Sequence, residues 1–122
     1  LPISYQMAQE DEKSIAPLTQ AATLSGDGEL SVRLAQAYVN LGRWEEAAEA
    51  AREGIRKGGL NRTDSANVLL GMSLFNLKRY GPARSAFAEA QKDSRSSAMA
   101  SQWIAYIGKE QERESELQRA LQ

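Results

Sequence analysis

The chain has 122 residues, of which 42% are hydrophobic and 25% charged, an ordinary composition for one modest globular domain. Its formal net charge is −1, so neither nucleic acid nor an anionic membrane surface is indicated as a partner. It contains no Cys and no His, which excludes disulfides, thiol nucleophiles, zinc fingers and every site that depends on an imidazole.

Apolar residues recur at helical spacing along most of the chain, and strand signals are weak. Leu30, Leu34 and Tyr38 form one apolar stripe, and Leu70 and Leu74 belong to another. The spacing predicts six short helices, near residues 12–24, 29–41, 44–57, 64–77, 80–92 and 96–108, followed by a helical but exposed tail.

Residues that favour turns separate the expected helices. The Gly-containing segments 25–28 and 57–60 each end a helix, and the polar run 92–97 is the last clear break. Asp27 and Asp64 stand where a helix is expected to begin, so each is predicted to act as an N-cap. The pattern therefore predicts short helices joined in pairs by tight turns.

The chain repeats itself at a fixed offset. Residues 40–47 read NLGRWEEA and residues 76–83 read NLKRYGPA, so the offset is 76 − 40 = 36 residues. A helix pair of this size is too small to bury its own apolar face, whereas stacked pairs can do so. An internal period in this range predicts a helical solenoid.

The recurring positions resemble the tetratricopeptide repeat, a helix–turn–helix unit of about 34 residues. The matching residues of the first clear copy are Leu34, Ala35, Tyr38, Gly42, Trp44, Ala47, Ala51 and Gly54. Those of the next copy are Leu70, Gly71, Leu74, Tyr80, Ala83, Phe87 and Ala90. Lys78 departs from the pattern, because Gly is usual at that place. Ala35, Gly71, Ala47 and Ala83 are expected to be small because helix axes cross closely there.

The resemblance implies an all-α fold, a right-handed superhelical solenoid of about three tetratricopeptide helix pairs, the first truncated, with a C-terminal capping helix. The expected division of the single domain is a partial repeat over 1–26, repeats over 28–61 and 64–95, and a capping helix with a charged tail over 96–122. A fainter copy is placed on Leu1, Tyr5, Ser14, Leu18 and Ala21. Trp103, Ile104 and Ile107 are expected to dock the cap on the preceding repeat, with Trp103 largely buried.

A narrower resemblance concerns location. Residues 57–90 and 100–107 are similar to the C-terminal end of bacterial tetratricopeptide proteins found with TonB energy-transduction systems, which implies a periplasmic or cell-envelope protein, with the cytoplasm as the alternative. No apolar run approaches the roughly 20 residues of a membrane span, so direct membrane insertion of this chain is not expected. The first residue is Leu1 rather than Met, and we interpret the chain as part of a longer protein whose targeting signal would lie upstream.

No motif indicates an enzyme. Glu45, Glu46 and the acidic residues of the last segment stand among Arg and Lys on expected helix surfaces, where solvation favours an ordinary ionised carboxylate. The Ser residues have no His to activate them. We therefore expect no catalytic residues, no metal and no cofactor.

A second stripe on the first helix of each repeat is expected to line the inner, concave surface. The predicted groove residues are Val32, Arg33, Gln36, Val39, Asn40, Val68, Met72, Phe75, Asn76 and Tyr106, with Met99 and Trp103 beside them. Neutral Asn can hydrogen-bond a peptide backbone in either sense, and Met and Phe suit an adaptable apolar groove. The carboxylate clamp known in this family, built from Lys, Asn and Arg, is excluded, because its places hold Val32, Gln36 and Leu69.

Phe75 and Met72 are expected to form the apolar centre of this groove, flanked by Asn40, Asn76 and Arg33. The alternative is that Val68, Met72 and Phe75 are simply core. Two functions stay open at this point. One is a protein-interaction scaffold that binds a peptide or partner protein in the groove. The other is a structural or self-assembly module whose groove packs on the rest of its own chain or on a second copy, so the oligomeric state is also open.

Overall fold

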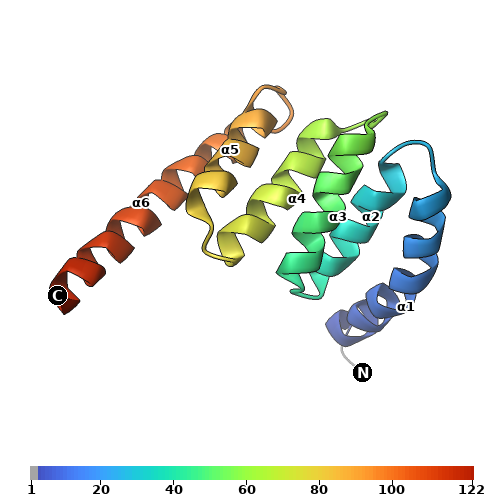
Figure 1. Cartoon of the computed structure of the whole chain (residues 1–122), viewed down its shortest axis with the longest axis horizontal. Helices are drawn as coiled ribbons and strands as arrows, with labels where there is room; N and C mark the ends of the chain where they lie inside the picture. The colour runs from blue at the N-terminus through green and yellow to red at the C-terminus, as the bar shows by residue number, and fades with distance from the viewer. Residues whose placement is uncertain (1–2) are drawn as a thin grey trace.

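The computed structural model describes residues 3–122, with side chains from Met7 onward, and this part of the chain is all-helical. The helices are α1 (Ile3–Leu24), α2 (Glu29–Asn40), α3 (Trp44–Lys57), α4 (Thr63–Asn76), α5 (Tyr80–Gln91) and α6 (Ser97–Leu121). Figure 1 shows them side by side in a row that starts with α1 and ends with α6. Short connections join them, so that neighbours along the row run in opposite directions.

The predicted all-α class is confirmed, and α2 to α5 begin and end within one residue of the predicted ranges. The charge order explains part of this agreement for α3, which carries Glu45 and Glu46 in its first turn and Arg56 and Lys57 in its last, the arrangement that the helix dipole favours. The helix then ends at Gly58, whose φ of 73° is readily adopted only by glycine.

The prediction for α1 was wrong at its start. The helix begins at Ile3 rather than near residue 12, so no turn divides the faint first repeat into two helices within the described residues. Pro17 lies inside α1 and cannot donate a hydrogen bond to the preceding turn, and the α1 ribbon bends along its length in Figure 1. Leu1 lies outside the described residues, as does the side chain of Tyr5.

The two predicted N-caps also differ from expectation. Gly28 holds the N-cap position of α2, although Asp27 accepts a hydrogen bond from the Glu29 amide at 3.0 Å. Asp64 lies inside α4, one residue after the helix starts, and Arg62 holds the N-cap position. Asp64 is buried, with 4% of its surface exposed. Its partners are Arg62 beside it and Arg95 and Ser96 of the α5–α6 connection.

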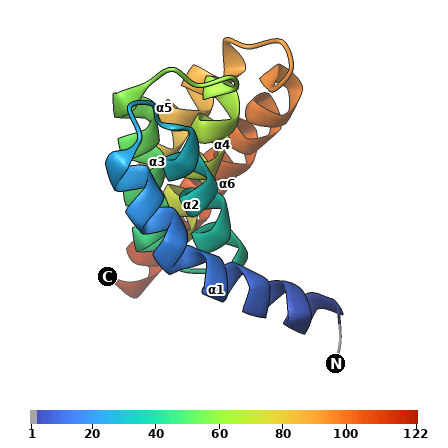
Figure 2. The same ribbon diagram turned by 90° about the vertical axis from the view of Figure 1, so that its right-hand side faces the viewer.

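Each helix packs on the next one in the chain, and α2 also contacts α4. Figure 2, which looks along the row, shows α3 and α5 on one side and α2, α4 and α6 on the other. The helices thus form two layers, and the residues of α2, α4 and α6 that turn away from α3 and α5 share one face of the molecule.

Small residues let the helices approach closely. A Cβ atom built on Gly28 would lie 2.0 Å from the carbonyl oxygen of Gly54, and one built on Gly54 would lie 2.8 Å from the side chain of Val32. Ala35 and Ala47 are fully buried. Gly28 and Gly54 must be small because atoms of the facing helix occupy the space that a larger side chain would need.

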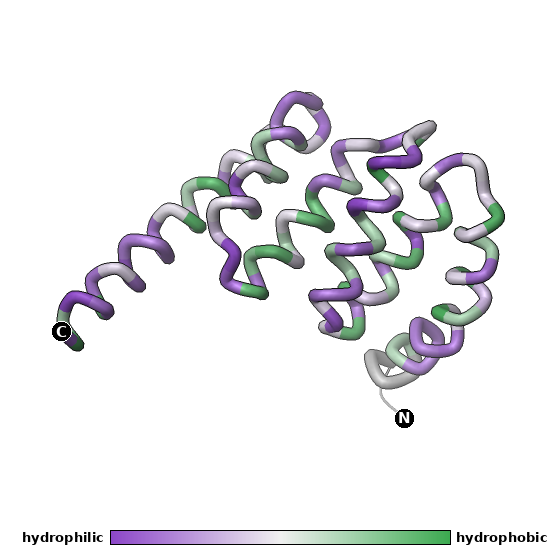
Figure 3. Tube along the Cα trace, viewed as in Figure 1, coloured by the Kyte–Doolittle hydropathy of each residue, from purple (hydrophilic) through white to green (hydrophobic). Residues whose placement is uncertain are grey.

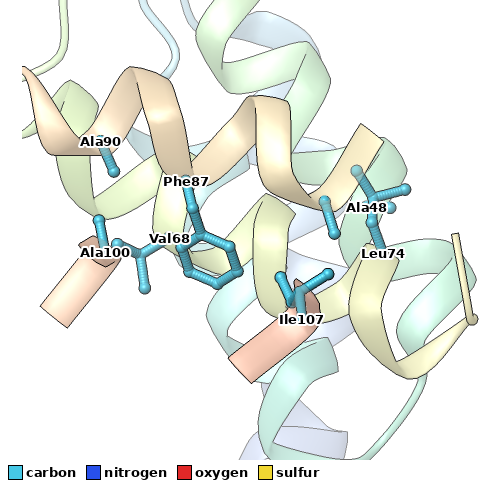
Figure 4. Packing of buried hydrophobic residues seen from close by; sticks show 8 residues of the cluster. Ala48, Val68, Leu74, Phe87, Ala90, Ala100 and Ile107 are labelled. Carbon is cyan, nitrogen blue, oxygen red and sulfur yellow. The ribbon is translucent and has the colours of Figure 1, made fainter. Parts of the chain in front are cut away.

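The C-terminal half of the core is organised by Phe87. A Cβ atom on Gly71 would lie 2.6 Å from the Phe87 ring, which stacks on Trp103 with centroids 5.1 Å apart and planes 7° apart. Figure 4 shows the Phe87 ring reaching from α5 toward Ala100 and Ile107 of α6. Both of these α6 residues are fully buried, whereas Trp103, predicted to be largely buried, is only half-buried. Its other surface lines a hollow described below.

The turns between paired helices share a left-handed residue. Gly42 has φ 71°, and Lys78, which occupies the same place 36 residues later, has φ 61°. Lys78 therefore adopts the conformation that glycine usually provides at this position, at a cost of about 1–2 kcal/mol relative to glycine's freedom. Its ammonium group lies 3.9 Å from the Glu114 carboxylate of α6.

Side-chain hydrogen bonds between different helices and their connections join residues that are about one repeat apart. The Lys57 ammonium donates to the Ala22 carbonyl, the Asn61 amide to Glu29, the Arg79 guanidinium to Glu45, and the Tyr80 hydroxyl to Glu114. These pairs are separated by 32 to 35 residues in sequence.

The last turns of α6 extend beyond α5 (Figure 1) and are coloured mainly as hydrophilic in Figure 3. Leu117 is 60% exposed and Leu121 is 79% exposed. As predicted, the tail is helical and exposed.

The small positions predict a large difference between two substitutions. Ala83→Leu should lower the free energy of unfolding by roughly 1–3 kcal/mol, because Ala83 is fully buried and an added isobutyl group overpacks the crossing of α4 and α5. Glu112→Gln, on the exposed face of α6, should change it by less than about 0.5 kcal/mol. Urea denaturation measures both, and equal effects would contradict this account of the core.

Truncation tests the role of α6 as a cover. A chain that ends at Asp93 lacks Ala100, Trp103 and Ile107 and exposes Phe87, so we expect it to aggregate or to lose part of its helical signal. A chain that ends at Glu110 keeps these contacts and should behave like the full chain in circular dichroism and light scattering. A fully folded, non-aggregating fragment ending at Asp93 would disprove the covering role.

Candidate partner-binding groove

A groove of about 450 Å³ lies on the face shared by α2, α4 and α6. Its lining comes from these three helices, from the residue before α4 and from the α5–α6 connection. The lining residues are Glu29, Val32, Arg33, Gln36, Arg62, Ser65, Val68, Leu69, Met72, Arg95, Ser96 and Met99.

The floor of the groove is apolar and belongs partly to the core. Val68 and Leu69 are each only 8% exposed, so they are core residues whose outer surfaces form the floor. Val32 and Met72 are half-buried beside them. For Val68 the core interpretation therefore holds, while Met72 keeps part of its flexible side chain open to the groove.

A second hollow, of about 230 Å³, continues the groove along α6. It is lined by Met99, Gln102, Trp103 and Tyr106. Met99 lines both hollows and is 47% exposed, and Tyr106 is 50% exposed. The two hollows together offer a long, shallow surface with exposed apolar side chains near one end.

Phe75 lies beneath this second hollow within an aromatic cluster. Its ring centroid is 5.7 Å from Tyr80, 5.4 Å from Trp103 and 5.5 Å from Tyr106. The edge-on and tilted geometries are those that aromatic quadrupoles favour. Phe75 therefore supports Tyr106 from below, and neither hollow is lined by its side chain.

The structure brings together the predicted groove residues Val32, Arg33, Gln36, Val68 and Met72 in the first hollow, and places Tyr106 in the second. The remaining predicted residues, Val39, Asn40, Phe75 and Asn76, line neither hollow.

The polar groups of the two Asn residues are partly occupied within their own helices. Gln36 donates its side-chain amide to the Asn40 oxygen at 2.8 Å, and the Asn76 amide donates to the Met72 carbonyl at 2.9 Å. Val39 is half-buried and packs on the core of α2 and α3.

The Asp64 network forms a polar wall of the groove that was not predicted from the sequence. Arg62 donates from Nε to Oδ1 of Asp64 at 2.9 Å and from Nη2 to Oδ2 at 2.6 Å. The Ser96 hydroxyl donates to Oδ2 at 2.6 Å, and the Arg95 guanidinium lies 3.8 Å from Oδ1. The Arg62–Asp64 spacing was visible in the sequence, whereas Arg95 and Ser96 lie about one repeat away and carry no local signal.

These partners keep Asp64 ionised. The Arg62 guanidinium holds the pKa of the Asp64 carboxyl well below its usual range, against the opposing effect of burial, and the hydrogen bond from Ser96 adds to the lowering. The same pair raises the pKa of Arg62. Asp64 is therefore a charged group that ties the start of α4 to the α5–α6 connection.

A larger depression, of about 790 Å³, lies between Arg84 of α5 and the charged half of α6. Charged and polar side chains dominate its lining, and no apolar floor from several helices lies beneath it. The smaller groove of α2, α4 and α6 is the better candidate because binding sites combine an apolar surface with a few placed polar groups.

Within residues 3–122, the structure contains no group of three or more His, Cys, Asp or Glu residues that could hold a metal ion. No helix of the described part of the chain is both long enough and apolar enough to cross a membrane. No protein-family model matches the chain, and no curated protein matches it.

The Asp64 network predicts a pH-dependent contribution to stability. Asp64→Asn should lower the free energy of unfolding at pH 7 by about 1.5–3 kcal/mol, because it removes charge-assisted hydrogen bonds from a buried site. Since the pKa of Asp64 is lower in the folded state, its contribution is complete above the unfolded pKa of about 3.9 and is lost as the pH falls toward the folded pKa.

Urea denaturation of both proteins from pH 7 down to about pH 2.5 measures this contribution. The difference between them should therefore narrow below about pH 4. Asp93→Asn is the matched control: Asp93 pairs with Arg95 at a more exposed site, so the loss should be under about 1 kcal/mol. A gap between wild type and Asp64→Asn that stays constant with pH would contradict the assignment.

Proposed function

We propose that this chain is a non-enzymatic interaction module that holds a peptide segment of a partner protein in the groove of α2, α4 and α6. The observation that carries the proposal is the continuity of the two hollows through Met99, which creates an elongated apolar surface with exposed Met99 and Tyr106. Contiguous exposed apolar surface with a polar border is typical of protein-interaction sites.

We propose further that the helices form a tetratricopeptide-type solenoid. The 36-residue offset supports this, because it places Val68 and Met72 of α4 beside Val32 and Gln36 of α2 in one groove. The fully buried Ala47 and Ala83 at equivalent positions also support it, as small residues at helix crossings are a feature of this repeat. A groove built by successive equivalent helices suits an extended segment better than a compact small molecule.

Binding rather than catalysis is proposed because of the ionisable groups in the groove. These are Glu29 and three Arg side chains, with Asp64 buried behind them and firmly ionised. Acid–base catalysis near neutral pH needs a group whose pKa lies near the working pH, whereas the pKa of Asp64 is lowered and the pKa of Arg62 is raised, both away from neutrality.

The proposed location is the bacterial cell envelope, beside a TonB-type system. This part of the proposal rests on the resemblance of residues 57–90 and 100–107 alone. Fractionation of cells that carry the full gene tests it, and recovery of the protein only from the cytoplasm would disprove it.

A self-assembly module is the second candidate, and the end of α6 favours it. Leu117 and Leu121 are exposed apolar residues that lie one helical turn apart on a segment that extends beyond α5. Light scattering over a range of protein concentrations separates the candidates: association that Leu117→Ser abolishes would support assembly through this tail.

The groove proposal predicts which substitutions weaken binding. We expect panning of a random twelve-residue peptide phage library on the immobilised chain to enrich binders. Tyr106→Ala and Met99→Ala should each weaken the best synthetic peptide at least tenfold in calorimetry, because exposed aromatic and flexible apolar side chains act as interface anchors. Leu117→Ala is the control and should leave the affinity unchanged, because Leu117 is an even more exposed apolar residue that lies outside the groove.

Phe75→Ala should behave differently from Tyr106→Ala. Because Phe75 packs on Tyr80, Trp103 and Tyr106, we expect its replacement by Ala to lower the free energy of unfolding by roughly 2–4 kcal/mol.

Failure of the library to yield any binder would disprove the groove proposal, as would equal weakening of peptide binding by Leu117→Ala and Tyr106→Ala.

A further inference from the structure

Three arginines from three different elements line the groove. Arg33 comes from α2, Arg62 precedes α4, and Arg95 lies in the α5–α6 connection. The one carboxylate among the lining residues belongs to Glu29, and its Oε1 atom already accepts the Asn61 amide at 2.7 Å. The charged side chains that a ligand meets here are therefore mainly cationic.

The carboxylates that pair with two of these arginines lie behind them. The side chain of Asp64 is 1% exposed, whereas that of its partner Arg62 is 42% exposed. Arg95 is 54% exposed and is held by Asp93 through its Nε and Nη2 atoms at 3.0 and 2.8 Å. The paired carboxylates thus fix the direction of two guanidinium groups, which lowers the entropy that binding would otherwise cost.

Fixed in this way, the arginines still have hydrogen-bond donors to offer. A guanidinium carries five N–H groups, and a two-point contact with a carboxylate uses two of them. The remaining groups of Arg62 and Arg95 are available to a second, external carboxylate, for which the planar guanidinium has matching geometry. Arg33 is exposed and makes no ion pair with the described residues.

The arginines are distributed rather than gathered on one point. Arg62 and Arg95 lie near each other, because both approach the Asp64 carboxylate, at 2.6 and 3.8 Å, whereas Arg33 belongs to α2. A single C-terminal carboxylate could pair with only some of the three arginines. Two or more carboxylates spaced along a peptide could pair with all three.

We propose that the groove selects an acidic internal segment of its partner, in which two or more Asp or Glu residues lie against Arg33, Arg62 and Arg95. The apolar residues that follow in the segment lie on Met72 and Met99 and reach Tyr106. This inference rests on the proposed function and adds the chemical class of the partner. Charge complementarity of this kind sets specificity and the association rate more than the total affinity.

The test uses the peptide library described above, with every selected peptide synthesised in two forms, one with blocked ends and one with a free C-terminus. We expect the selected sequences to be enriched in Asp and Glu next to apolar residues. Their affinity should fall at least fivefold between about 0.05 and 0.5 M salt, because the contacts are partly exposed and screened. Arg33→Glu should weaken them at least tenfold.

Arg52→Glu is the matched control, since Arg52 is exposed on α3, in the layer away from the groove, and it should change the affinity less than twofold. Arg33→Gln is a second variant, which removes the positive charge without reversing it and should also weaken binding. Thermal melts check that each variant folds. Enrichment of basic or neutral peptides would overturn the acidic assignment while leaving the groove as a binding site. Binding lost on amidation of the C-terminus would overturn the internal-segment assignment. No binder at all would disprove the groove itself.

Discussion

The contact between Phe87 and Gly71 sets the positions of the C-terminal helices. The ring approaches the bare backbone of α4 so closely that a Cβ atom at position 71 would lie 2.6 Å from it. Trp103 then stacks on the same ring and fixes α6 against α5. Met99 and Tyr106 lie one turn to either side of Trp103. The positions of these two groove residues therefore depend on glycine at position 71 of α4.

Features with a local sequence signal could be predicted, whereas those that depend on packing between distant residues could not. The helices α2 to α5 could be predicted because each carries a clear apolar stripe and ends in a turn signal. For α1 the spacing indicated a start near residue 12, but helix propensity without amphipathic order extends it to Ile3. Asp64 stood before an apolar run and so had the local signal of a cap. Besides the nearby Arg62, its partners are Arg95 and Ser96, which are brought to it only by the packing of α4 against the α5–α6 connection.

Some residues of the candidate groove could be predicted from the sequence and others could not. Val32, Gln36, Val68 and Met72 could be predicted because the repeat offset equates their places on successive helices. Arg62 and Arg95 could not, since they stand outside the helices, where no periodicity applies. Asn40 and Asn76 occupy equivalent places, yet each is hydrogen-bonded within its own helix. Asn40 accepts from the Gln36 side chain, and Asn76 donates to the Met72 carbonyl, the local bond that short polar side chains often make in helices.

The hydrogen bonds between helices that tie this chain together span no more than 35 residues. Low contact order of this kind favours rapid folding, with neighbouring helices able to form a nucleus anywhere along the row, and it leaves the two ends to unravel first. A segment lying across α2, α4 and α6 would supply the long-range link that the chain itself lacks. Binding of such a segment would then stabilise the terminal helices together with the central ones, so that the chain would unfold in a single cooperative transition rather than helix by helix.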